Sequence, residues 1–239
     1  MVKVVLLILV VVVGLLVILE GSLRLLLGFG NPLIYVADKD IGYLLAPNQR
    51  TKRFGNHIAI NNYSMRSSAI AQKRPASTLR VLLLGDSVAN GGWWTAQDQT
   101  ISALIATQLK PMVNELSGAK LSTQTSFDRV EVLNASAQSW GPRNELAYLK
   151  RFGTFDAQVV VLLINTDDLF ATAPTSIPVG RDRQYPNQKP SSALAEVFNR
   201  YLSKAAPIPE MNAVYGEPGD RVGFNLEAIG QLQALAEER

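Results

Sequence analysis

The 239-residue chain contains no cysteine and only one histidine, His57. The lack of cysteine excludes disulfide bonds, thiolate nucleophiles and cysteine-ligated metals, although it does not indicate a cellular compartment. A single histidine excludes a zinc site built from clustered imidazoles. Any reaction that needs an imidazole base has His57 as its only source within this sequence.

Charge is also sparse, at 18% of residues with a net charge of +3. Lysine and arginine are scattered except at Arg50, Lys52 and Arg53, so the chain lacks the extended basic stripe that binds a phosphate backbone. The composition argues against nucleic-acid binding. With 47% hydrophobic residues it is typical of a globular protein with an apolar excess, not of low-complexity disorder.

The apolar excess is concentrated in residues 4–19, an uninterrupted run between Lys3 and Glu20. At about 1.5 Å per residue the run is about 24 Å long, and it can be extended by Met1 and Val2 and by snorkelling of Lys3 and Arg24. It predicts an uncleaved signal-anchor, with residues 4–27 in the lipid bilayer. The alternatives are a cleaved signal peptide, for which no clean cleavage site follows, and a buried core helix. We expect the amino terminus inside and the globular body outside the cytoplasm, in a single-pass arrangement.

Turn residues at 28–32 end this helix, so residues 1–30 form the predicted anchor. Residues 31–77 contain short alternating segments, such as 57–60 between two pairs of turn-forming residues, and predict a small β-rich segment. Residues 78–239 repeat one theme, a short apolar strand followed by a turn and a helical pattern. The β-rich segment is expected to be a cap or stalk on this domain.

Three strands are predicted in residues 78–239, at 79–84, 130–133 and 159–164. Helical spacing follows the first at Ile101, Leu104, Ile105 and Leu109, with Asp98 or Thr100 as its cap, and a second helix begins at Pro142. Alternating strands and helices predict an α/β fold with a parallel sheet. The third strand is apolar throughout, which predicts that both of its faces are covered.

After Asp168 the pattern loosens, and six prolines are spread over about forty residues with one helical stretch at 193–203. We expect an insertion over the strand ends, a lid or substrate loop. Asn225 is expected to cap a last helix that ends near Arg239 without a glycine stop. A further strand should follow such a helix, so the chain is expected to be a truncated fragment.

Polar loops follow all three predicted strands, at 85–87, 134–137 and 165–168. Parallel strands bring their carboxyl ends to one edge of the sheet, so a hydroxyl, a turn and a polar pair can converge there. Ser87 is the candidate nucleophile because it follows a buried strand and a glycine turn. Acyl transfer requires such a nucleophile, an imidazole base and donors to the carbonyl oxygen.

These residues resemble the SGNH or GDSL hydrolases, in particular membrane-anchored members. Gly85-Asp86-Ser87 looks like the first block of the family, residues 134–141 are similar to the second and residues 160–169 to the third. Residues 41–48 and 60–66 look like the segment that precedes the domain in anchored members. The resemblance implies a three-layer, flavodoxin-like parallel sheet and an ester hydrolase.

The resemblance also implies site roles, with departures at several positions. Ser87 would be the nucleophile, and its amide and that of Ser136, which replaces the family's glycine, would bind the oxyanion. Asn165 and Asp167 stand where the family has glycine and asparagine, so either is a candidate third contributor, although a carboxylate at Asp167 would repel an oxyanion. The family's Asp-x-x-His block has no match, and we expect that histidine beyond Arg239.

Other candidates have plainer interpretations. His57 is expected to be a surface histidine, and Trp93 and Trp94 to line a substrate pocket, pack on the β-rich segment or lie at the membrane interface. Asp167 and Asp168 are too few ligands for a metal. Arg143 and Glu145 are expected to be solvated residues in the first turn of a helix, and Asn144 to order the second loop.

The sequence thus predicts a membrane-anchored serine esterase, acyl hydrolase or acetyltransferase, acting on O-acyl esters of envelope glycans or lipids through Ser87. No cofactor and no metal are implied. The alternative is a non-catalytic binding or scaffold domain that kept the sheet and lost the catalytic histidine.

Overall fold

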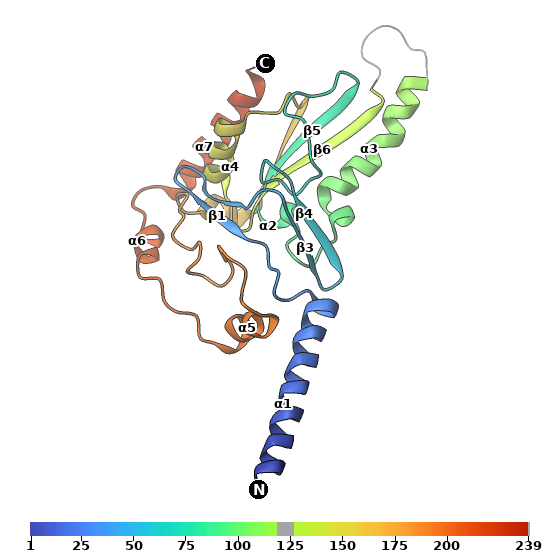
Figure 1. Cartoon of the computed structure of the whole chain (residues 1–239). Coiled ribbons are helices and arrows are strands. Elements are labelled where there is room, and N and C mark those ends of the chain that lie inside the picture. The colour runs from blue at the N-terminus through green and yellow to red at the C-terminus, as the bar shows by residue number, and fades with distance from the viewer. Residues whose placement is uncertain (119–126, 239) are drawn as a thin grey trace.

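The computed structural model describes residues 1–118 and 127–238 (Figure 1). Helix α1 (Val2–Ser22) continues into one turn of π-helix, η1 (Leu23–Leu27), and projects from the globular body, which it contacts near its end at Glu20. None of its side chains is buried, which excludes the core-helix alternative. Together α1 and η1 are long and apolar enough to cross a membrane. Gly28, at φ 75°, ends the helix, and a side chain there would collide with the Lys52 carbonyl.

The β-rich segment consists of two antiparallel hairpins, as its alternating pattern predicts. Strands β1 (Tyr35–Asp38) and β2 (Gly42–Leu45) form the first, and β3 (Gln49–Arg53) and β4 (Asn56–Ile60) form the second. Their buried side chains join the core of the α/β domain and do not form one of their own. The shared core includes Ile41, Tyr43, Leu45, Ile58, Met65, Leu82, Leu84, Leu133, Trp140 and Tyr148.

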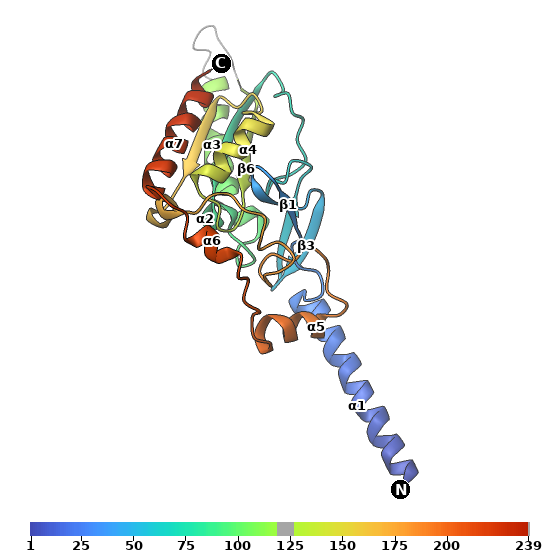
Figure 2. The same cartoon turned by 90° about the vertical axis from the view of Figure 1, so that its left-hand side faces the viewer.

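The α/β domain contains a three-stranded parallel sheet of β5 (Thr78–Gly85), β6 (Arg129–Ser136) and β7 (Val159–Leu163) in the order β6-β5-β7. Helix α3 (Ile101–Gly118) connects β5 to β6, and helix α4 (Pro142–Phe152) connects β6 to β7. The two connections run in opposite directions across the sheet, so right-handed crossovers place their helices on opposite faces. Figures 1 and 2 show α3 on one side of the sheet and α4 on the other. The mixed α/β, parallel-sheet prediction is confirmed at this level.

Strand β7 differs from its prediction, because it is not covered on both faces. All five of its residues are partly or largely exposed, and Val159 is 45% exposed. It lies at the edge of the sheet and pairs with β5 alone among the described strands. An all-apolar run is typical of a central strand, but the order of strands in a sheet is not encoded in one strand's composition.

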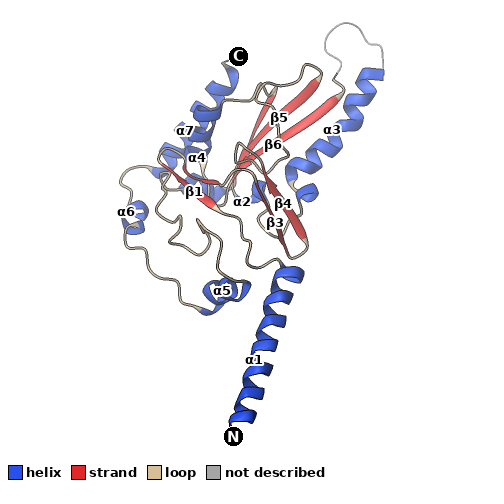
Figure 3. Ribbon diagram, in the orientation of Figure 1, coloured by secondary structure: helices blue, strands red, loops and turns tan. Residues whose placement is uncertain are grey.

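Five short helices or turns, one π-helical turn and the longer helix α7 complete the described structure (Figure 3). They are α2 (Ser87–Asn90), the 3₁₀-helices η2 (Gln97–Gln99) and η3 (Thr166–Phe170), α5 (Ala193–Val197) with the π-helical turn η4 (Phe198–Leu202), α6 (Met211–Tyr215) and α7 (Arg221–Glu237). Helix α7 packs on α4 and η3. Its cap is Asp220, whose side chain accepts from the Gly223 amide, and not Asn225 as predicted. Asn225 is buried inside the helix and donates to the carbonyls of Leu169 and Ala171, while Arg239 lies outside the described residues.

The proline-rich segment between η3 and α7 is not a lid over Ser87, which stays exposed. It packs instead against β1, β2 and the end of α1. The Tyr35 amide donates to Pro186 O over 2.8 Å, and the Tyr185 ring contacts the rings of Tyr35 and Tyr43. The segment between η3 and α7 therefore contacts both the first hairpin and the predicted anchor.

Candidate functional site

The carboxyl ends of the three parallel strands lie at the edge of the sheet nearer to α1, where Figures 1 and 2 both place α2. The chain leaves β5 for β6 on one side and returns to β7 on the other, so the switch in strand order lies beside the end of β5. Open α/β sheets bind ligands in the crevice at such a point. Ser87, the first residue of α2, stands there and is exposed.

Asp86 joins the first and third loops. Its Oδ1 accepts from the Val88 amide over 2.8 Å and caps α2. Its Oδ2 accepts both the Ser87 hydroxyl, at 3.3 Å, and the Asn165 side-chain amide, at 3.1 Å. Two candidate residues that are far apart in sequence therefore share one carboxylate oxygen.

Ser136 joins the first and second loops, but it is only 1% exposed. The Asn90 side chain donates to Ser136 O over 3.0 Å, and the Ser136 hydroxyl donates to Asn134 Oδ1 over 2.5 Å. Asn134 in turn donates to Ala89 O over 2.7 Å. This buried network holds the first turn after Ser87 against the end of β6.

The third loop is closed by reciprocal hydrogen bonds between Asn165 and the residues that follow it. Asn165 Oδ1 accepts from the Asp167 amide over 2.7 Å, and Asp168 Oδ2 accepts from the Asn165 amide over 2.8 Å. Asn165 and Asp167 are exposed, whereas Asp168 is buried. Burial and the nearby Asp86 and Asp167 raise the pKa of Asp168 above that of an ordinary aspartate.

Glu145 is a buried carboxyl behind these loops, and its predicted solvation is wrong. It is fully buried in the first turn of α4, and neither of its carboxyl oxygens has a hydrogen-bond partner in the described part of the chain. Burial, with Asp168 and Asp86 nearby, raises its pKa well above the ordinary glutamate value. Arg143 is also largely buried, and it binds both carboxylate oxygens of Glu217, at 2.6 and 2.9 Å. The local sequence pattern does not reveal this burial, because the partner of Arg143 lies 74 residues away in the sequence.

The end of the β-rich segment supports the loop that carries Ser87. Asn61 Oδ1 accepts from the Met65 amide over 3.1 Å and shapes the turn before Arg66. The Arg66 side chain, 1% exposed, donates to the carbonyls of Asn90, Gly92 and Thr95. The motif at 60–66 that resembles anchored hydrolases thus holds the chain just after α2.

The first hairpin supports the second loop in the same way. The Tyr43 hydroxyl donates to Gln138 O over 2.6 Å, and Trp140 Nε1 donates to Tyr43 O over 3.1 Å. Asn144 accepts from the Gly141 amide and donates to Ile41 O over 2.8 Å. The ordering role predicted for Asn144 is therefore present in the structure.

The chain's one histidine and its tryptophan pair lie on or against the second hairpin. His57 is exposed on β4, opposite Lys52. The Trp93 ring contacts the guanidinium groups of Arg53 and Arg200, and Trp94 stacks on Phe54 with ring centroids 5.1 Å apart. Of the roles considered for the tryptophans, packing on the β-rich segment is the one the structure shows. Within residues 1–118 and 127–238, no three His, Asp or Glu side chains gather in a way that could hold a metal ion.

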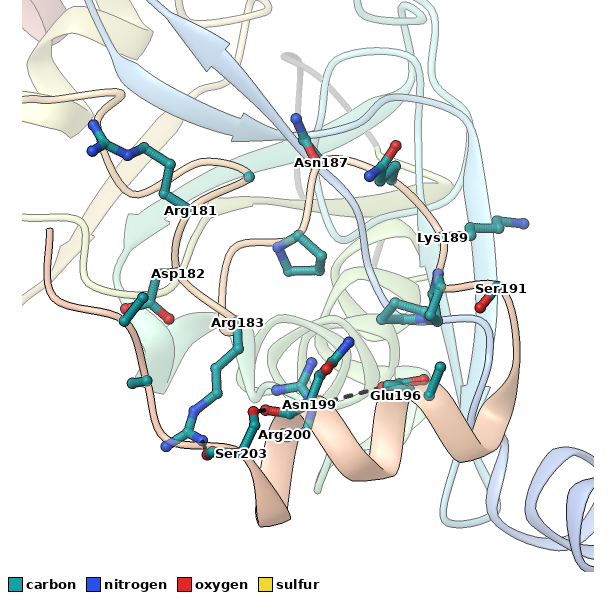
Figure 4. Close-up of a pocket in the computed structure, with 18 of the residues that line it drawn as sticks. Arg181, Asp182, Arg183, Asn187, Lys189, Ser191, Glu196, Asn199, Arg200 and Ser203 are labelled. Carbon is teal, nitrogen blue, oxygen red and sulfur yellow. Dashed lines mark hydrogen bonds and ion pairs between the residues drawn. The ribbon is translucent and has the colours of Figure 1, made fainter.

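Two cavities lie in the proline-rich segment, and Ser87 lines neither. The larger, of about 680 Å³, lies between the chain at 180–191 and the face of α5 and η4 that carries Glu196, Asn199, Arg200 and Ser203 (Figure 4). The other, of about 570 Å³, is lined by side chains from 172–185 and 206–215 together with Tyr43, Ser139 and, from α4, Asn144.

No protein-family model matches the chain, and no curated protein matches it either.

Proposed function

We propose that the protein is a membrane-anchored serine esterase or acyl-transferring enzyme of the SGNH type, in which Ser87 attacks the acyl carbonyl of an O-acylated envelope glycan or lipid. Ser87 Oγ forms a bond to the carbonyl carbon and gives its proton to a base. The ester C–O bond then breaks, and the leaving alcohol takes up that proton. Water, or the hydroxyl of an acceptor, releases the acyl group from Ser87.

The observation that carries the proposal is the sharing of Asp86 Oδ2 by the Ser87 hydroxyl and the Asn165 amide. It brings an exposed hydroxyl and an exposed amide donor together at the switch point of the sheet. Through Asp86, the loop that carries Ser87 is linked to the loop after β7.

Asn165 is the better third oxyanion donor of the two candidates. Its NH₂ group has two hydrogens, and the bond to Asp86 uses one. Asp167 is exposed beside it, but a carboxylate would destabilise a developing oxyanion. The Ser87 amide, at the first position of α2, lacks an intrahelical acceptor and is a second donor. Ser136 is buried, so its amide would contribute only after the second loop opens.

Among the described residues, no imidazole is shown in contact with Ser87 to act as the base. His57 is exposed on β4, and the Ser87 hydroxyl donates to the Asp86 carboxylate. A carboxylate is a weaker base than imidazole at neutral pH, since general-base catalysis is most efficient when the pKa is near the working pH. The proposal therefore includes an imidazole supplied from outside the described residues.

The anchor fits a substrate at the membrane surface. The strand ends and α2, which begins at Ser87, are in the half of the molecule from which α1 emerges. An acylated lipid, or a glycan held close to the membrane, would reach this edge of the sheet more readily than the opposite one. We further propose that the globular body lies outside the cytoplasm.

The experiment is covalent labelling of the full chain in detergent with a fluorophosphonate, with and without added imidazole. We expect one labelled residue, Ser87, and faster labelling with imidazole because the free base replaces the missing one. Ser87→Ala abolishes labelling. Asn165→Ala slows it by roughly tenfold or more because an oxyanion donor is lost, whereas the neighbouring Asp167→Asn leaves the rate equal or faster.

Circular dichroism of each variant verifies that the fold is intact. Absence of Ser87-dependent labelling in a folded protein, with imidazole present, would rule out nucleophilic chemistry at this residue. That result would favour the alternative, a non-catalytic binding or scaffold domain.

A further inference from the structure

Helix α5 and the turn η4 form a short amphipathic helix beside the end of α1. Polar and charged residues on one face, Glu196, Asn199, Arg200 and Ser203, line the larger cavity (Figure 4). The other face carries an apolar stripe at the spacing of one helix side, formed by Leu194, Val197, Phe198, Tyr201 and Leu202. Its outer part is uncovered, since Phe198 is 57%, Tyr201 55% and Leu202 72% exposed.

This helix is attached to α1 where the apolar run ends. Glu20 is the first charged residue after the run, and its carboxylate accepts from the amides of Ala193, over 2.8 Å, and Leu194, over 2.9 Å. Glu20 also pairs with Arg24 over 2.5 Å. Charged side chains are costly in hydrocarbon, so Glu20 and Arg24 mark the boundary of a bilayer that α1 would cross. The start of α5 is therefore at that boundary.

Further apolar side chains are exposed at the end of η1. Phe54 donates its amide to Leu27 O over 3.0 Å at the end of η1, and Trp94, 74% exposed, stacks on the Phe54 ring. Leu25 and Leu26, in η1, are 76% and 69% exposed. Tryptophan and tyrosine at this level are typical of the membrane–water interface.

The buried ion pair of Arg53 with Glu196 fixes α5 to the globular body. The Gly30 amide also donates to Glu196 over 2.6 Å, and the Tyr201 ring contacts that of Phe29 at 6.1 Å. Figures 1 and 2 show α5 next to the end of α1 with its axis across that of α1. The helix is therefore positioned rigidly with its apolar stripe outward.

From these contacts we infer that α5 and η4 are an interfacial helix, whose stripe of Phe198, Tyr201 and Leu202 is inserted in the lipid leaflet around the end of α1. The occupant of this surface is the bilayer, because α5 contacts α1 and η1, whose apolar side chains are exposed and long enough in series to cross a membrane. Insertion of a second element next to the anchor holds the domain at one height and tilt, with the strand ends near the membrane. The inference depends on the anchor of the proposed function, but not on the chemistry of Ser87.

The chain's lack of cysteine allows the test with single-cysteine variants labelled with NBD. Full-length Phe198→Cys, Leu202→Cys, Asn199→Cys and Leu226→Cys are reconstituted in vesicles of phosphatidylcholine and phosphatidylglycerol and exposed to dithionite. Leu226 is 53% exposed on α7 and reports the aqueous rate, while Leu9→Cys reports whether α1 is in the bilayer. We expect NBD at Phe198 and Leu202 to be reduced roughly tenfold more slowly than at Leu226, with Asn199 close to Leu226.

Equal rates at Leu202 and Leu226, with Leu9 protected, would overturn the interfacial helix and leave the anchor in place. A fast rate at Leu9 would overturn both. Equal protection of NBD at Asn199 and Leu202 would show that the polar and apolar faces of the helix are equally shielded. That result would also overturn the inference. Fluorophosphonate labelling of the same samples reports the Ser87 chemistry separately.

Discussion

A Cβ atom built on Gly85 would lie 2.9 Å from the carbonyl oxygen of Leu163, at the end of β7. It would also lie 2.7 Å from the Ala89 Cβ, in α2. Gly85 is paired with Leu163 in the parallel register, so its hydrogen side chain allows β5, β7 and α2 to meet directly behind Ser87. The glycine of the Gly-Asp-Ser sequence is therefore required by close packing and not by an unusual backbone conformation.

Gly85→Ala is accordingly expected to destabilise the protein by about 1–3 kcal/mol through overpacking, and to separate Ser87 from Asn165. The matched control is Gly230→Ala inside α7, where an added methyl group would have no atom of another element within 4 Å. There alanine should stabilise the protein by about 0.5–1 kcal/mol, because it has the higher helix propensity. Urea unfolding of both full-length variants measures the difference, and equal midpoints would contradict the packing argument.

Arg66 is expected to be the main support of the chain after α2. Arg66→Ala leaves three buried or half-buried carbonyls without their donor, and should reduce the free energy of unfolding by about 3 kcal/mol. The loss should be local first, so hydrogen exchange of residues 88–95 should accelerate before that of β6.

Arg74→Ala provides the comparison for Arg66. Arg74 also donates to backbone carbonyls, those of Pro75, Ala76, Thr78 and Asp156, but it is only half-buried, and water can replace its bonds. Its loss should cost less than about 1 kcal/mol. A similar cost for both substitutions, or unchanged exchange at 88–95 in Arg66→Ala, would refute the supporting role.

Much of the fold could be predicted from the sequence because its strands are short, apolar and separated by clear turns. The loops after β5 and β7 meet because parallel strands share one carboxyl edge, which follows from topology alone. The order of the strands could not be predicted in the same way, because the apolar composition of β7 indicates a central strand and the strand lies at the edge.

The errors on α4 and α7 come from contacts with parts of the chain that are distant in sequence. Glu145 has the position of a solvated first-turn acid, but it is fully buried, with Asp86 and Asp168 nearby. Asn225 has the residue type of a cap, but Asp220 precedes it and caps the helix, and Asn225 instead binds the carbonyls after η3. A local pattern predicts whether a segment is a helix or a strand, but it does not predict which distant residues its side chains contact.

Glu145 should make stability depend on pH. Its carboxyl is buried without a hydrogen-bond partner among the described residues, and its pKa is raised well above the ordinary value by burial and by Asp168 and Asp86. Between the ordinary pKa and the raised one, the folded protein holds a proton that the unfolded chain releases. The protonated Glu145 carboxyl therefore contributes fully to the free energy of unfolding below the ordinary glutamate pKa. This contribution is lost as the pH rises towards the raised pKa, by up to about 1.4 kcal/mol per pH unit.

Glu145→Gln keeps the shape and removes the proton equilibrium, so its unfolding free energy should fall less steeply than that of the wild type as the pH rises above the ordinary glutamate pKa. Asp168, whose pKa is also raised, contributes a slope of the same sign that remains in the variant. Glu227→Gln, on the exposed face of α7, is the control and should leave the slope unchanged. Urea titrations at several pH values measure the slopes, and identical slopes for Glu145→Gln and the wild type would show that Glu145 is ionised in the folded protein.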